Sequence, residues 1–192
     1  METRTADRIL AEQWQTYVTD DDYEPEDVAE EVAPFGFEWP GLADAPSGPW
    51  ADADQLALKV LADVAEGQQR QNEMSKYGKV EFALRRPYRS AEVPALFEER
   101  HMTFVSPYGA ADLCTILGSW EERFGTRLVG FADDRVIVSV AAPVRTIGEA
   151  ERIAAEHFAF SPDTIVQDYD GILSVYAANQ VLGCEVWSFW WD

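Results

Sequence analysis

The chain has 192 residues, of which 47% are hydrophobic, and its formal net charge is −20. This length and composition are typical of one globular domain with room for a short appendage. No apolar run approaches the roughly 18 residues of a membrane span, and the first residues lack the features of a secretory signal. The charge repels nucleic-acid phosphates and anionic membranes, so direct binding to either is not expected.

The first helix is predicted over residues 5–18. Ala6, Ile9, Leu10, Trp14, Tyr17 and Val18 fall on one stripe at helical spacing. A stripe of this kind packs on the body of a domain or, alternatively, binds a partner.

The segment after this helix is strongly acidic and contains Asp20, Asp21, Asp22 and Glu24. Residues 1–66 hold 17 acidic and 3 basic residues, so most of the negative charge lies in the first third of the chain. Such a charge serves solubility or forms a surface for a basic partner. We treat residues 1–38 as an N-terminal appendage with a helix and this acidic segment.

The remaining residues, 39–192, are predicted to form a single domain. Hydrophobic spacing, capping residues and glycines predict its elements. We expect a helix capped by Asp52 or Asp54 that runs to about residue 66 and ends at Gly67, and a helix over 147–161 that opens with a capping box of Thr146 and Glu149. Further helices are expected over 90–99, 110–124 (ended by Gly125) and 172–180, and strands over 79–85, 102–105, 128–131, 136–141 and 186–191. Hairpin and helices are mixed without a regular repeat, which favours an α+β fold with a mixed or mainly antiparallel sheet covered by helices.

The last strand carries four large aromatic residues. Trp187, Phe189 and Trp191 alternate with Val186 and Trp190, so both faces of the strand are mostly apolar. A strand buried on both faces is usually central in its sheet. We therefore expect the C-terminal strand to be central and Asp192 to need a basic partner, with Arg123 and Arg127 as candidates.

Few residues are arranged for chemistry. There is no glycine-rich phosphate loop, no nucleophile elbow and no zinc-ligand spacing, so we expect no metal or cofactor. His157 lies on the apolar stripe of its helix, which is typical of a packed histidine. An acid–base role would use Glu156 or a distant carboxylate to orient its ring, with Asp163 as a further weak candidate.

Arg123 follows Trp120 on the predicted helix 110–124, and both are candidate binding residues. We expect it to pair with a buried carboxylate, with Asp192 and Asp163 as the candidates, or to bind a ligand. The two cysteines, Cys114 and Cys184, lie far apart in apolar segments and are expected to be reduced thiols of a cytoplasmic protein.

Several segments carry a family resemblance. They are Trp39–Ala43, Arg89–Ala91, Gly118–Gly125, Ala154–Asp163 and Trp187–Asp192. Together they resemble domain of unknown function 4253, an uncharacterised bacterial family common in actinobacteria. The resemblance is strongest over 107–192 and weaker over 39–106. It implies a shared fold but no activity, because none is established for the family.

Three functions agree with these observations. The leading hypothesis is a non-enzymatic module, immunity- or inhibitor-like, that binds a protein with a basic surface. The second is a small hydrolase or ligand-binding domain that uses Glu156, His157, Arg123 and Asp163. The third is an acidic mimic of nucleic acid that inhibits a DNA-binding enzyme.

Overall fold

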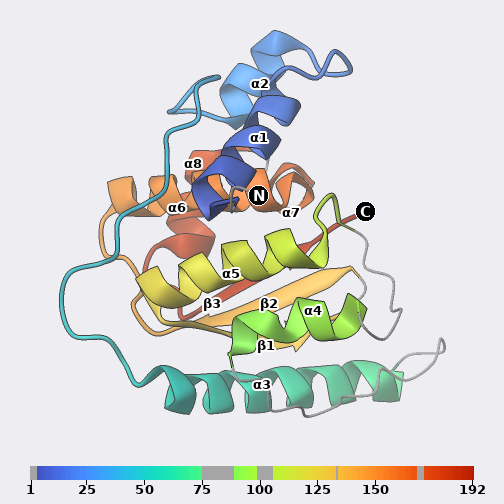
Figure 1. Cartoon of the computed structure of the whole chain (residues 1–192), viewed down its shortest axis with the longest axis vertical. Coiled ribbons are helices and arrows are strands. Elements are labelled where there is room, and N and C mark those ends of the chain that lie inside the picture. The colour runs from blue at the N-terminus through green and yellow to red at the C-terminus, as the bar shows by residue number, and fades with distance from the viewer. Residues whose placement is uncertain (1–3, 75–88, 99–105, 133, 168–170) are drawn as a thin grey trace.

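The computed structural model describes residues 4–74, 89–98, 106–132, 134–167 and 171–192 (Figure 1). Within these residues, helices pack on a three-stranded antiparallel sheet, so the predicted α+β class is confirmed. The predicted strands 79–85 and 102–105 lie outside the described residues. The helical elements are α1 (Ala6–Val18), α2 (Pro25–Glu31), α3 (Ala53–Met74), η1 (Ser90–Glu92), α4 (Val93–Glu98), α5 (Ala110–Phe124), α6 (Ile147–Phe160), α7 (Pro162–Val166), α8 (Leu173–Tyr176) and the π-helical η2 (Ala177–Val181).

The sheet has the order β1 (Thr126–Phe131), β2 (Arg135–Val140) and β3 (Val186–Trp190). A bulge interrupts the pairing of β1 with β2 between Leu128 and Gly130. At Gly130 a side chain would meet the Cβ of Ile137 at 3.2 Å, so the close approach of the two strands favours glycine there.

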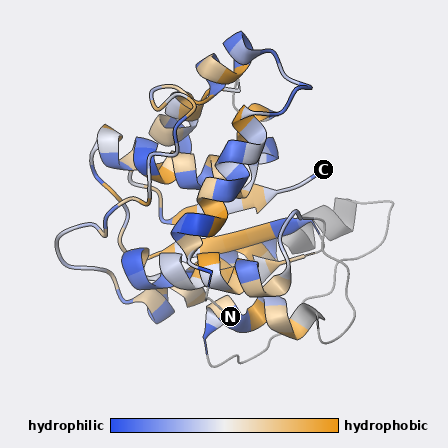
Figure 2. Cartoon of the chain, turned by 45° about the horizontal axis from the view of Figure 1, so that its top comes forward, coloured by the Kyte–Doolittle hydropathy of each residue, from blue (hydrophilic) through white to orange (hydrophobic). Residues whose placement is uncertain are grey.

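Each face of the sheet is covered by different helices. The face that carries Trp187 and Phe189 packs against α5 and α6, where Trp120 and Phe160 contact the Phe189 ring. Helix α3 packs on the opposite face of β1 and β2, through a smaller cluster that includes Val60. Figure 2 shows the hydrophobic residues along the strands between these layers.

The predicted central position of the C-terminal strand is wrong for the described sheet, because β3 pairs only with β2 and lies at an edge. Trp187 and Phe189 are buried as predicted, but Val186 on the other face is 39% exposed. At the far end of this edge, Trp190 is held by hydroxyl groups. Its N–H donates to Thr164 Oγ1 at 3.0 Å, and its C=O accepts from Ser161 Oγ at 2.6 Å.

The expected basic partner of Asp192 is also absent from the described contacts. Asp192 is exposed, and its N–H donates to Asp163 Oδ2 at 3.1 Å. Arg127 instead pairs with Asp54 in the first turn of α3, at 2.8 Å. An exposed carboxylate keeps its water and needs no protein partner, so the argument from burial does not apply to this residue.

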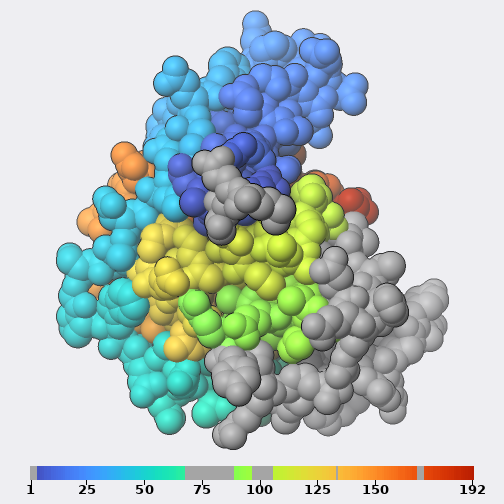
Figure 3. Space-filling model, viewed as in Figure 1, coloured from blue at the N-terminus to red at the C-terminus, as the bar shows by residue number. Residues whose placement is uncertain are grey.

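The N-terminal helices share the core of the rest of the chain. The buried residues of α1 and α2, among them Trp14 and Val28, belong to the same cluster as the buried residues of α5 and α6. The predicted stripe of α1 is therefore confirmed as a packing face. Figure 3 shows these N-terminal residues in dark and light blue, gathered at one end of the molecule.

Helix ends follow the sequence in most places. Thr146 and Glu149 form the predicted capping box of α6, and Gly125 ends α5 in the left-handed conformation with φ 62°. Gly67 was expected to end α3, but the helix continues to Met74. The part of the chain that the structure describes contains no helix long and apolar enough to cross a membrane.

Candidate functional site

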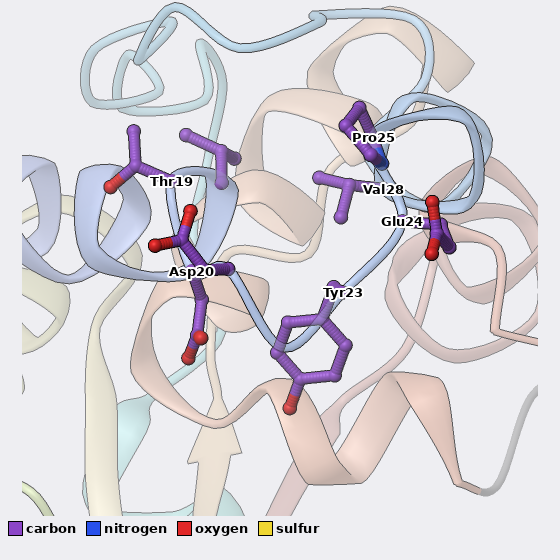
Figure 4. A pocket seen from close by; sticks show the side chains of 8 residues that line it. Thr19, Asp20, Tyr23, Glu24, Pro25 and Val28 are labelled. Carbon is purple, nitrogen blue, oxygen red and sulfur yellow. The ribbon is translucent and has the colours of Figure 1, made fainter.

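A pocket lies between the end of α1 and the start of α2 (Figure 4). Its volume is about 260 Å³. Three of the predicted binding residues, Asp20, Asp21 and Glu24, line it together with Tyr23. Asp22, the fourth acidic residue of the prediction, is outside the lining, but its N–H donates to Asp20 Oδ1 at 3.0 Å.

The local sequence explains why the chain turns here. The hydroxyl of Thr19 donates to the carbonyl of Gln15, which closes the last turn of α1. The bond between Asp22 N–H and the Asp20 carboxylate is the turn that an aspartate forms with its own following backbone. Pro25 then occupies the first position of α2, where its missing N–H is not needed.

Two tyrosines connect this pocket to the core. The Tyr23 ring stacks on Tyr17, with ring centroids 5.0 Å apart and an angle of 24° between the rings. Tyr17 meets the edge of Phe158 on α6 and donates its hydroxyl hydrogen to Glu31 Oε2 at 2.8 Å. Tyr23 itself is 46% exposed, so an aromatic surface fixed to the core is available at the pocket.

Carboxylates from separate elements affect the pKa of Tyr23. Burial raises the pKa of Tyr23, and the negative charges of Asp20, Asp163, Glu31 and Asp22 raise it further. These groups belong to the α1–α2 connection, to α2 and to α7. Each of these negative charges disfavours the ionised form of the Tyr23 hydroxyl.

A second constellation joins α5 to α6 through an ion pair. Arg123 Nη1 and Nη2 donate to Glu156 Oε1 and Oε2, both at 2.7 Å. The Glu156 side chain is fully buried and that of Arg123 is 17% exposed. The sequence predicted that Arg123 pairs with a buried carboxylate, which is confirmed. The carboxylates proposed for it, Asp192 and Asp163, were wrong.

Other donors complete the hydrogen bonding of Glu156. Trp120 Nε1 donates to Oε2 at 2.8 Å, and the N–H of Ala43 donates to Oε1 at 2.8 Å. Arg123 in turn donates to the Ala43 carbonyl at 2.8 Å and to Ser119 Oγ at 3.2 Å. Each carboxylate oxygen thus accepts two bonds from fixed donors. This arrangement stabilises a buried carboxylate, and it leaves little room for Glu156 to exchange protons with a substrate.

His157 follows Glu156 but lies in different surroundings. Its ring is fully buried against Trp187, whose ring centroid is 4.5 Å away, and its Nδ1 lies 3.1 Å from the hydroxyl of Tyr176. Its Nε2 has no hydrogen-bond partner among the described residues. Burial, and secondarily the charge of Arg123, lowers the pKa of His157 well below its usual 6.5. The ring is therefore neutral at physiological pH.

The structure does not bring the proposed acid–base residues into one cleft. Asp163 is on α7, where it accepts hydrogen bonds from Gln167 and from the backbone of Asp192. Trp120 joins the two other candidates, since it donates to Glu156 and its ring centroid lies 5.3 Å from that of His157. Its role in the structure is to pack and to fix the carboxylate.

Sequence reasoning missed several contributors to both constellations. Tyr17, Tyr23 and Glu31 were not assigned to a site, and neither was the backbone of Ala43. The signal that the two tyrosines carry in the sequence is their position at either end of the turn that contains Asp20, Asp21 and Asp22. A backbone group carries no sequence signal at all, because every residue has one.

Comparison with models of protein families identifies the family of this chain. The model of the family described as Domain of unknown function (DUF4253) matches residues 87–192, which is more than half of the chain. The chain belongs to the DUF4253 family. No curated protein and no solved structure matches it. The DUF4253 match includes Arg123 and Glu156, whereas Ala43 and the acidic pocket lie outside it.

Proposed function

We propose that this DUF4253 protein is a protein-binding module whose acidic pocket binds an arginine of a basic segment on another protein. The observation that carries the proposal is the pocket between α1 and α2, which is lined by Asp20, Asp21 and Glu24 and by Tyr23, whose side chain is exposed. If this basic segment belongs to the active or binding site of the partner, the bound DUF4253 protein would block that site, as an inhibitor or immunity protein does.

The size of the pocket suits one side chain. Pockets for drug-sized ligands have volumes of roughly 300–1,000 Å³, and this one, at about 260 Å³, is smaller. A guanidinium group stacks on a tyrosine ring and forms paired hydrogen bonds with a carboxylate, whereas an ammonium is a compact point charge. The combination of Tyr23 with Asp20 and Glu24 therefore favours arginine over lysine.

The overall charge supports the same kind of partner. A net charge of −20 attracts a basic protein over several ångströms and speeds its encounter with the pocket. The charged pair in the interior, Arg123 with Glu156, is bonded within the protein and contributes to the fold. The proposal therefore places function at the surface.

The test is calorimetric titration with a nine-residue peptide that contains one arginine pair among glycines and serines. The pocket variant replaces Asp20, Asp21 and Glu24 with Asn, Asn and Gln, which keeps size and hydrogen-bond acceptors. The control variant neutralises three exposed acidic residues elsewhere, Asp63, Glu92 and Glu185.

We expect the pocket variant to bind the peptide roughly tenfold or more weakly, which corresponds to about 1.4 kcal/mol. The control variant should bind within about a factor of two or three of the wild type, and a peptide with lysines should bind more weakly than the arginine peptide. Equal losses in both variants would show that only the net charge matters, and would overturn the assignment to the pocket.

A further inference from the structure

The buried ion pair holds the main chain of a segment outside the DUF4253 match. Ala43 donates its N–H to Glu156 Oε1 and accepts a bond at its C=O from Arg123 Nη1, both at 2.8 Å. The two side chains lie within the matched residues 87–192, and Ala43 does not. Two bonds to the N–H and C=O of a single residue hold an extended peptide through its main chain, and the pockets around its side chains then set the specificity.

The segment around Ala43 has the form of a strap. We define the strap as residues 39–52, which contain neither helix nor strand and run from the end of the molecule formed by α1 and α2 to the first turn of α3 (Figure 1). Trp39 Nε1 donates to Asp7 Oδ1 at 2.9 Å, and the N–H of Ala51 donates to the Ala141 carbonyl at 2.9 Å. Between these ends, Ala43 is buried and most of its successors are exposed.

We propose that Arg123 and Glu156 form a main-chain recognition site for an extended peptide, and that the strap occupies this site in cis. The Ala43 methyl group is buried, with 3% exposure, so the site selects a small side chain at that position. Leu42, which packs against the core, marks an apolar preference one residue earlier. When the strap dissociates, the site takes an extended apolar peptide of another protein. This site is separate from the acidic pocket and does not depend on the function proposed for it.

The decisive variant is Ala43→Pro in the full chain. Proline has no N–H to donate to Glu156, so the strap loses its central attachment while both side chains of the site remain. A free peptide with the sequence of residues 38–47 should bind this variant with a dissociation constant below about 1 mM and raise its melting temperature. The same peptide should not bind the wild type, because a tethered segment competes at an effective concentration of about millimolar or more.

Two controls accompany this titration. The variant Ala45→Pro changes an exposed residue of the strap, so it should behave like the wild type. A peptide that itself carries proline in place of Ala43 should not bind any variant. If the Ala43→Pro protein is folded and the unaltered peptide does not bind it, the proposal is wrong.

Hydrogen exchange on the wild type tests the same proposal without a variant. A strap that leaves its site exchanges the Ala43 amide through a local opening, which needs less free energy than global unfolding. We expect the Ala43 amide to exchange at least tenfold faster than that of Val138, which lies in the central described strand. Equal protection at both positions would show that the strap is an integral part of the core, and would overturn the proposal.

Discussion

Removal of Arg123 tests the energetic role of the buried ion pair. The variant Arg123→Leu leaves the fully buried Glu156 carboxylate without its cation, and with only the two donors from Trp120 and Ala43. Loss of one partner from a buried ion pair costs about 3–5 kcal/mol. The Ala43 carbonyl also loses its donor, at a cost of about 1 kcal/mol. We therefore expect the free energy of unfolding to fall by about 4–6 kcal/mol.

Urea unfolding followed by tryptophan fluorescence measures this change, because the buried Trp120 donates to Glu156 and packs against the buried Trp187. The matched control is Arg8→Leu, since Arg8 is 59% exposed and pairs with Glu12 one helical turn away. Exposed pairs of this kind contribute about 0.3–0.5 kcal/mol. A loss below about 1 kcal/mol for Arg123→Leu would refute the reasoning, because it would mean that water reaches the carboxylate.

Three further predictions concern stability. Deletion of residues 187–192 removes three buried aromatic side chains from one face of the sheet, so the truncated chain should not melt cooperatively in circular dichroism; a cooperative melt would contradict this. Thr146→Ala removes the capping box with Glu149 and should lower the free energy of unfolding by about 1 kcal/mol, and an unchanged urea midpoint would speak against the cap. The pKa of His157 is lowered in the folded state, so below pH 6.5 the unfolded chain binds more protons than the folded chain. The contribution of His157 to the free energy of unfolding should therefore be complete above pH 6.5 and should fall by up to about 1.4 kcal/mol per pH unit below it. This component should vanish in a folded His157→Gln variant, and its persistence there would assign it to other groups.

The fold was predictable where one pattern had one physical cause. The stripe of α1, from Ala6 to Val18, has helical spacing and lies on the core as expected. The glycines did not predict helix ends uniquely, because Gly67 and Gly125 both follow apolar helical patterns. Only Gly125 adopts the left-handed conformation that ends a helix, and the close approach of Trp50 and Ala141 to it is a tertiary contact that local sequence does not reveal.

The last strand shows a different limit of sequence reasoning. Its aromatic residues occupy both faces, which predicted burial on both. Burial of the second face requires a covering layer. In the part of the chain that the structure describes, α3 packs on β1 and β2, whereas Val186 on β3 is 39% exposed. Trp190 was expected in the core, but it is only partly buried, so its environment is partly apolar and partly solvent.

The acidic pocket and the buried ion pair differ in how far the sequence could predict them. The acidic residues of the pocket were visible as a charged segment, but the pocket exists because Tyr23 folds back onto Tyr17 after the turn. The partner of Arg123 could not be chosen from the sequence, since Glu156 lies in the next long helix and adjoins a run of apolar residues. Long-range pairs of this kind depend on how helices pack, which local patterns do not determine.

Chemical-shift mapping tests the central claim most directly. The arginine peptide is titrated into the isotope-labelled full chain, and backbone amide shifts are followed by nuclear magnetic resonance. If the pocket is the binding site, the largest shifts will lie in residues 19–28, with a saturating response that weakens as salt shortens the screening length from about 10 Å at 0.1 M to about 3 Å at 1 M. Shifts centred on the sheet, or spread evenly over all acidic surfaces, would contradict the assignment of function to the pocket.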